Sequence, residues 1–160
     1  AELAARAAQA LSVACREDEN RVAIAAVGGI PPLVGLLLDG TDAQKRYAAA
    51  LLWNLAANAA NSLSIASAGA IVPLIRLACE GTEAQKARAV GALHILAFNA
   101  DNAVSIARAG GIAPLISLVS AGDAAQKEQA AGGLANLSYN NADNQLAIEF
   151  MGGVPPLVAL

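Results

Sequence analysis

The residues that could perform catalysis or hold a metal are few in this sequence. His94 is the single histidine, and no cysteine or carboxylate pair stands at metal-ligand spacing from it. No glycine-rich stretch is followed by Lys-Ser or Lys-Thr, as a phosphate-binding loop would be. Cys15 and Cys79 are expected to be small buried apolar side chains. The sequence therefore predicts a protein that is not an enzyme, with no metal and no cofactor.

Composition narrows the classes of partner and compartment. Of the 160 residues, 56% are hydrophobic and 14% are charged, which excludes an intrinsically disordered chain. The net charge of −3 and the lack of a basic cluster argue against nucleic-acid binding. The charge-free stretch 47–75 is interrupted by Asn, Ser, Gly and Pro, so it predicts short helices and no membrane span. Two distant cysteines and no signal peptide favour an intracellular location, cytoplasmic or nuclear.

A repeat of 41 residues organises the chain. The tripeptide Ala-Gln-Lys recurs with this period, and so do a glycine position and several apolar positions, with one extra residue inserted in the stretch 140–144. The apolar columns are Leu11, Leu52, Leu93 and Leu134; Ile24, Ile65, Ile106 and Ile148; and Leu33, Leu74, Leu115 and Leu157. Several independent columns at one spacing predict a solenoid of stacked units.

Each unit is predicted to contain three helices. An asparagine is predicted to cap the first helix, which ends at a glycine (Asn20, Asn61, Asn102 and Asn144; Gly28, Gly69, Gly110 and Gly152). A proline in the first turn then marks the second helix (Pro32, Pro73, Pro114 and Pro156). A capping-box pattern opens the third helix, which runs roughly to residue 57, 98 or 139 (Thr41 with Gln44, Thr82 with Gln85, and Asp123 with Gln126).

The phase of the repeat divides this single domain into five parts. Residues 1–16 form a partial third helix, 17–57, 58–98 and 99–139 are complete repeats, and 140–160 are a partial repeat. Neither end shows the polar outer face that usually caps a solenoid, so we expect an excised or engineered segment. The two ends are complementary parts of one repeat, which predicts head-to-tail self-association.

The segments 68–77 (AGAIVPLIRL) and 51–55 (LLWNL) resemble the armadillo repeat family. The resemblance covers nearly the whole chain, and the short first helix distinguishes it from two-helix HEAT repeats. It implies an all-α, right-handed superhelix of about four stacked three-helix repeats. It also implies that the third helices line a concave groove, which binds an extended or disordered peptide segment of another protein.

Helical periodicity predicts which side chains face this groove. At 100° per residue, Ala48, Leu52 and Leu55 form a buried stripe, and the opposite stripe faces the groove. The expected groove stripes are Arg6, Gln9, Val13 and Arg16; Tyr47, Ala50, Asn54 and Ala57; Arg88, Gly91, Ile95 and Phe98; and Gln129, Gly132, Asn136 and Tyr139, with Trp53 and His94 on the flank. Exposed aromatic side chains are typical binding hot spots. The alternative, that Trp53 packs on the neighbouring third helix, stays open.

Asn54 and Asn136 stand in the column where peptide-binding armadillo repeats place an asparagine. A side-chain amide can pair with both the N–H and the C=O of one peptide residue. Ile95 and Val13 interrupt this column. The nuclear-import branch has a tryptophan one turn before the asparagine, whereas Gly91 and Gly132 stand there in this sequence, either for close helix packing or to widen the groove.

These patterns predict a non-enzymatic protein–protein interaction module that binds an extended peptide in the groove. Because the groove stripes carry arginines and no acidic residue, we expect a partner with apolar anchors and acidic or neutral flanks. The alternative is a structural repeat block that folds and associates end to end without a specific peptide ligand.

Overall fold

The structure is a computed structural model that describes residues 10, 11, 13–15 and 17–160. Its described part contains eleven helices and no strand. Their bounds are α2 Asp18–Ala26, α3 Ile30–Asp39, α4 Asp42–Ala56, α5 Ala59–Ser67, α6 Ile71–Glu80, α7 Glu83–Leu96, α8 Ala100–Arg108, α9 Ile112–Ala121, α10 Ala124–Ser138, α11 Ala142–Phe150 and α12 Val154–Val158.

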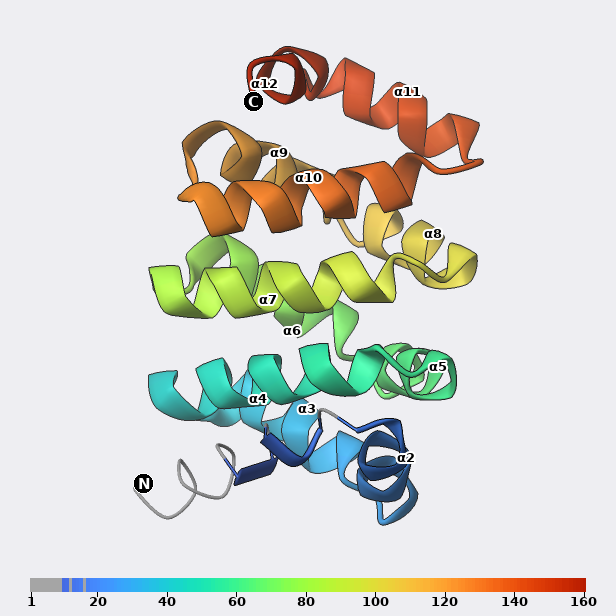
Figure 1. The fold of residues 1–160 in the computed structure, drawn as a ribbon. Coiled ribbons are helices and arrows are strands. Elements are labelled where there is room, and N and C mark those ends of the chain that lie inside the picture. Colours follow the sequence, from blue (N-terminus) through green and yellow to red (C-terminus); the bar gives the residue numbers. More distant parts are fainter. Residues whose placement is uncertain (1–9, 12, 16) are drawn as a thin grey trace.

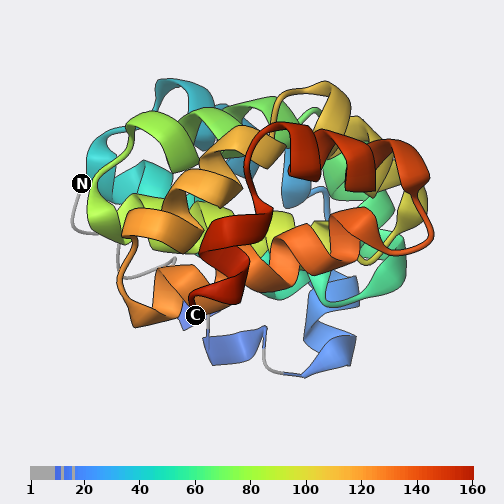
Figure 2. The ribbon, with the colours of Figure 1, turned by 90° about the horizontal axis from the view of Figure 1, so that it is seen from above.

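The helices form a stack of triplets. Each triplet consists of a first, a second and a third helix: α2, α3 and α4, then α5, α6 and α7, then α8, α9 and α10. The third helices α4, α7 and α10 lie one above another on one side of the molecule, and α11 and α12 begin a further repeat at the end of the stack (Figure 1). The view along the stack shows successive repeats overlapping (Figure 2). The predicted right-handed α-solenoid is confirmed.

Glycine ends each first helix, as predicted. Gly69 has a φ of +84°, in the left-handed region that favours glycine, and its N–H donates to the Ala66 carbonyl. The Ala70 N–H donates to the Ile65 carbonyl, which completes a Schellman motif. The same turn bends the first helix of each complete repeat from the second by 79°, 83° and 85°. No single helix in the described residues is long and apolar enough to cross a membrane, although these three bent pairs reach the required length and composition as pairs.

The capping boxes at the third helices are confirmed. The Gln44 N–H donates to Thr41 Oγ1, while Gln44 Oε1 accepts from the Thr41 N–H. The boxes at α7 and α10 have the same two bonds. Two of these glutamines also join adjacent repeats, because Gln85 Nε2 donates to the Asp42 carbonyl and Gln126 Nε2 donates to Glu83 Oε2. The first turns of the third helices therefore form contacts between adjacent repeats.

The predicted N-caps of the first helices are wrong by three residues. Asn58, Asn99 and Asn141 cap α5, α8 and α11, and Glu17 stands at the cap of α2 without a side-chain bond. Asn61 and Asn102 are buried inside the first turn, where their amides donate to Arg21 O and Ser62 O of the preceding repeat. Asn144 is buried too and donates to Leu137 O, whereas the exposed Asn20 donates to Ala14 O. These asparagines tie the first helices to the chain that precedes them.

The core is one continuous stack of the predicted apolar columns. Leu52, Leu93 and Leu134 are buried, and so are the isoleucines of the first helices α5, α8 and α11 (Ile65, Ile106 and Ile148). Residues of these columns near the two ends, Leu11 and Leu157, are more exposed than their central equivalents. The columns therefore depend on neighbours on both sides.

The two cysteines lie in different environments. Cys15 is buried as predicted, and burial raises the pKa of its thiol, partly offset by the positive charge of Arg21. The prediction that Cys79 is buried is wrong, because it lies near the end of α6 on the exposed side of that helix. Both thiols are free.

Candidate functional site

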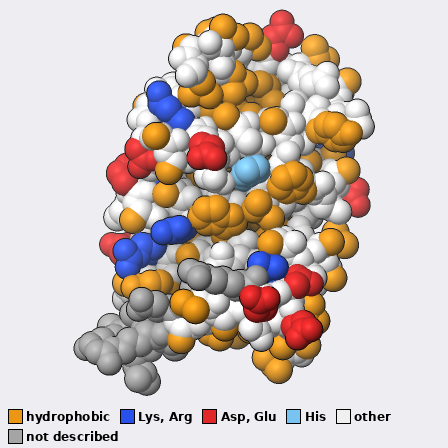
Figure 3. Space-filling view, in the orientation of Figure 1, with side chains coloured by type: hydrophobic (Ala, Val, Ile, Leu, Met, Phe, Trp, Pro, Cys, Tyr) orange, Lys and Arg blue, Asp and Glu red, His pale blue; other side chains and the backbone are white. Residues whose placement is uncertain are grey.

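The third helices turn one face to the core and the other to solvent. Ala48, Leu52 and Leu55 of α4 are buried, so the predicted core stripe is confirmed. Figure 3 shows the opposite face in the orientation of Figure 1, with the pale-blue histidine near its middle and hydrophobic surface beside it. We call this surface the third-helix face. Of its predicted residues, Arg6, Gln9 and Arg16 lie outside the described part of the chain.

Trp53 packs directly against the next third helix. A Cβ atom added to Gly91 would lie 2.7 Å from carbons of the Trp53 indole, so only glycine allows this approach. The Arg88 guanidinium carbon lies 5.8 Å from the centroid of the same ring, in cation–π contact. Trp53 is half-buried as a result. Gly91 therefore allows close packing of α4 and α7, which was one of the two roles that the sequence left open for this glycine.

His94 repeats this arrangement one unit further along. A Cβ atom on Gly132 would lie 2.7 Å from the His94 ring. His94 Nδ1 lies 2.9 Å from Gln129 Oε1, and because an amide oxygen only accepts, Nδ1 donates in this pair. The ring also stacks on Phe98, with 5.6 Å between centroids and an angle of 29° between planes. Three neighbours thus fix the orientation of His94.

The asparagine column is partly used inside the protein. Asn136 Nδ2 donates to the His94 backbone carbonyl of the preceding third helix at 3.1 Å. This bond leaves Asn136 Oδ1 and the second amide hydrogen for another partner. Asn54 is half-buried at the equivalent position of α4. At Asn136 the column therefore joins adjacent helices.

The aromatic side chains of the predicted site differ in exposure. Phe98 and Tyr139 are 68% and 78% exposed at the ends of α7 and α10. Tyr47 is half-buried near the start of α4, where its Oη accepts from Arg46 Nη2 and the Arg46 guanidinium covers its ring. Arg46 was not predicted as a groove residue, because residues i and i+1 of a helix do not usually face each other.

The structure brings most of the predicted residues into two clusters. One consists of Trp53 and Arg88, and the other consists of His94, Phe98, Gln129 and Asn136. Ile95 is half-buried beside the second cluster and packs on the core. Tyr47 and Tyr139 belong to neither cluster. The clusters present amide, aromatic and cationic groups, which suit noncovalent recognition.

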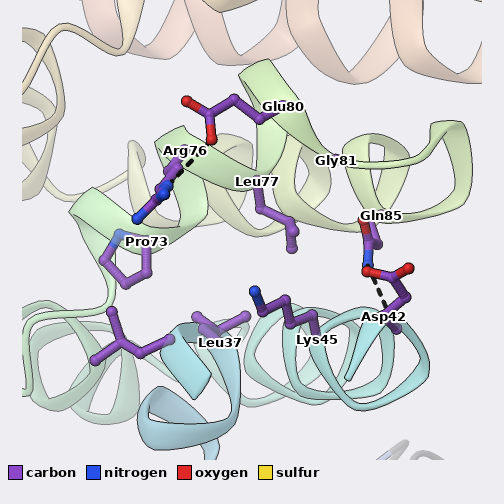
Figure 4. A pocket seen from close by; sticks show the side chains of 10 residues that line it. Leu37, Asp42, Lys45, Pro73, Arg76, Leu77, Glu80, Gly81 and Gln85 are labelled. Atoms are coloured by element: carbon purple, nitrogen blue, oxygen red, sulfur yellow. Dashed lines mark hydrogen bonds and ion pairs between the residues drawn. The ribbon is translucent and has the colours of Figure 1, made fainter. Parts of the chain in front are cut away.

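A separate hollow of about 210 Å³ lies at the seam between the first two complete repeats (Figure 4). Lys45 of α4 and Leu77 of α6 point into it, and Arg76 pairs with Glu80 at its edge, 3.1 Å apart. Asp42 accepts from Gln85 across the seam. The carboxylates at this seam are thus already bonded within the protein. Among the described residues, no three His, Cys, Asp or Glu side chains are grouped to hold a metal ion.

Comparison with known proteins places the chain in a family. A family model described as the armadillo/beta-catenin-like repeat matches residues 17–57 and 99–139. The chain belongs to the armadillo repeat family. No curated protein sequence matches it.

Some solved structures that share this fold are described as designed armadillo repeat proteins, and others as engineered proteins. A designed armadillo repeat protein in complex with peptide (KR)4 superposes with a TM-score of 0.91 at 25% identity, over 99% of this chain and 68% of that one. A computationally designed armadillo repeat protein for modular peptide recognition gives 0.91 at 26% identity, over 99% and 68%. An engineered protein gives 0.91 at 30% identity, over 98% of this chain and 39% of that one.

The armadillo third helices of this protein depart from the import-type pattern in a way that the packing explains. At Gly91 and Gly132 the protein has no side chain to offer a ligand. The space beside these glycines is filled by Trp53 and His94, which come from the preceding repeat. On the third-helix face, the rings of Trp53 and His94 therefore each contact the third helix of the next repeat.

Proposed function

We propose that this armadillo chain is a non-enzymatic binding module that holds an extended peptide segment of another protein on its third-helix face. The observation that carries the proposal is that a ring-and-cation cluster and a ring-and-amide cluster join successive third helices, with Phe98 and Tyr139 exposed on the same side. The designed relatives lend support, since two of them are described with a peptide or for peptide recognition.

The geometry suits a backbone-reading mode of binding. Packed helices lie ~8–10 Å apart, so Asn54 and Asn136, two repeats apart, would be separated by roughly 16–20 Å. An extended peptide advances ~3.3 Å per residue, so about five or six residues would separate the two contacts. Each amide bond contributes a net ~0.5–1.5 kcal/mol, and aromatic contacts add sequence preference.

The charges of the face favour an acidic or neutral partner with apolar anchors. Arg88 lies over Trp53 and Arg46 lies over Tyr47, so each cation stands beside a ring. A polybasic peptide such as the (KR)4 ligand of the designed relative would meet these arginines. We therefore expect salt-sensitive binding of a peptide whose flanks are not basic, since exposed charges are screened within ~10 Å at 0.1 M salt.

The test is the double variant Asn54→Ala and Asn136→Ala, measured with peptides selected from a random library on the unmodified protein. Loss of two amide pairs should weaken binding by roughly 5- to 150-fold, equivalent to ~1–3 kcal/mol. The thermal midpoint should fall modestly, because Asn136→Ala also removes the internal hydrogen bond to His94 O. Asn20→Ala is the matched control, because Asn20 also donates to a backbone carbonyl but lies on a first helix. Equal affinities of the double variant and the control would remove the asparagines from the proposal.

The alternative role, end-to-end association, has an observation of its own. Val154, Val158 and Leu160 are exposed near the end of the chain, whereas their equivalents one repeat earlier, Ile112, Ile116 and Leu118, pack in the core. A hollow of about 250 Å³ between α10 and the last two helices is lined by Leu134 of α10 and Leu157 of α12, among others. This surface resembles a face that packs on another repeat, and the dependence of molecular mass on protein concentration tests its role.

A further inference from the structure

An apolar hollow lies at the edge of the third-helix face, where α4 and α7 end. Its volume is about 260 Å³, and its walls include Ala56 and Ala57 from one repeat and Ala59, Ile95 and Phe98 from the next. No ionisable side chain lines it. It is separate from the seam hollow of Figure 4 and adjoins the cluster of His94 and Phe98.

The 41-residue repeat explains why the hollow is open at this place. Ala57 is the residue that corresponds to Phe98 one repeat later, and Ile95 corresponds to Asn136. In this hollow, the small side chain of Ala57 forms part of one wall and the branched apolar side chain of Ile95 forms part of the other. One repeat further on, the corresponding positions carry a large ring and a polar amide. The apolar hollow is therefore a property of one position in the array.

Two polar side-chain atoms at the hollow, Ser62 Oγ and Asn99 Oδ1, are already bonded within the protein. Ser62 Oγ accepts from Asn102 Nδ2 at 3.0 Å, and Asn99 Oδ1 accepts from the Asn102 N–H at 3.0 Å. A charged occupant would lose water and find no opposite charge among the lining residues. An uncharged apolar occupant loses no hydrogen bond by entering, and it covers part of the exposed Phe98 ring.

The Phe98 wall is held in position before any ligand arrives. Its ring stacks on His94, which is fixed in turn by Gln129 and by the absence of a side chain at Gly132. A side chain that is already ordered loses little conformational freedom when a ligand binds, which favours affinity. Rigid, exposed aromatic residues beside a hollow are typical of binding hot spots.

We propose that this hollow holds one uncharged apolar side chain, of the size of leucine, isoleucine or methionine, from the extended peptide bound on the third-helix face. The proposal rests on the proposed function and adds a sequence preference to it. The peptide backbone would be held by amide groups such as Asn136, and the hollow would select a single peptide position. Polar and charged residues at that position would be disfavoured.

The experiment compares selection from a random library of peptides about twelve residues long, which extend well past all three third helices at ~3.3 Å per residue. Peptides enriched on the unmodified protein should share one apolar position. Replacing that residue by alanine should weaken binding roughly ten- to hundred-fold, the effect of losing one buried apolar side chain. The variant Ala57→Phe fills the hollow with a ring, which Phe98 supplies at the equivalent position one repeat later. On this variant, alanine at the shared apolar position of the peptide should change affinity less than about threefold.

Ala113→Phe is the matched control, because it adds the same ring at an exposed position of the second helix α9, away from the third-helix face and the hollow. It should retain the apolar preference. Phe98→Ala, which removes one wall from an exposed position, should lose it and provides a second test if Ala57→Phe does not fold. Enrichment of no peptide would contradict the proposed function itself. Peptides that bind without a shared apolar position, or whose preference survives both Ala57→Phe and Phe98→Ala, would overturn this inference alone.

Discussion

At the scale of single residues, polar side chains join one repeat to the next. Asn102 is buried and donates to Ser62 O and Oγ, 40 positions earlier in the chain. Gln126 reaches the backbone carbonyl and the side chain of Glu83, 43 positions earlier. A buried polar group without a partner costs ~1–3 kcal/mol, so each of these contacts also penalises a slipped stack. The repeats are therefore held in register by hydrogen bonds as well as by apolar packing.

The Glu83 carboxylate predicts a dependence of stability on pH. A hydrogen bond from Gln126, and then one from Lys86, hold the pKa of Glu83 below its usual value of 4.5. A lowered folded-state pKa contributes stability that is complete above the unfolded-state value and is lost as the pH falls through the folded-state value. Thermal midpoints of the unmodified protein and Glu83→Gln should therefore differ at neutral pH and converge below pH 4.5.

Glu128→Gln serves as the control for this titration, because Glu128 is exposed on the neighbouring third helix α10. It should change the thermal midpoint little at any pH. A constant difference between Glu83→Gln and the unmodified protein from pH 7 to pH 3 would show that the charge of Glu83 plays no part in the inter-repeat contact.

At the scale of elements, the spacing of the third helices depends on two glycines. Alanine at position 91 would place a Cβ atom 2.7 Å from the Trp53 ring. Overpacking costs ~1–3 kcal/mol, whereas alanine in a helix gains ~0.5–1 kcal/mol over glycine. We therefore expect Gly91→Ala to lower the free energy of unfolding by about 1–2 kcal/mol and to change the fluorescence of Trp53, which is the single tryptophan.

Gly35→Ala isolates the effect of helix propensity. Gly35 lies in α3, and a Cβ atom there meets nothing within 4 Å. This variant should gain ~0.5–1 kcal/mol and leave the Trp53 fluorescence unchanged. If Gly91→Ala were as stable as Gly35→Ala and had the same spectrum, close packing would not be the reason for glycine at position 91.

At the scale of the whole molecule, the apolar end of the stack predicts weak self-association. Fully burying an exposed Val or Leu side chain contributes ~1.5–3 kcal/mol, while association costs ~4–15 kcal/mol in lost freedom. Burial of Val154, Val158 and Leu160 would therefore give a contact that forms only at high concentration. Sedimentation should show a mass that rises with protein concentration, through a head-to-tail contact.

Val158→Glu should abolish this rise, because it places a charge where the equivalent Ile75 is buried inside the stack. Val72→Glu is the control, since Val72 is similarly apolar and exposed but lies on α6 in the middle of the stack. A constant monomer mass at high micromolar concentration, or an equal effect of the two substitutions, would exclude association through this end.

The local signals in the sequence were sufficient for the helices and their repetition. Capping boxes such as Thr41 with Gln44 act over three residues, and Gly69 ends a helix through its own backbone conformation. The repeat spacing aligned Leu52 with Leu93 and Leu134, and stacking then buried all three. Fold class and the order of elements were therefore predictable, because short-range contacts determine them and the repeat multiplies the signal.

Contacts between repeats decided what the sequence left open. Asn58 and Asn61 are both suitable caps, and only the burial of Asn61 against Arg21 O shows which of them caps α5. Trp53 could have faced solvent or a neighbour, and Gly91 on the next third helix determines that it packs. These choices depend on residues about one repeat apart, which come together only when the solenoid stacks. Tertiary structure alone therefore determined the shape of the third-helix face.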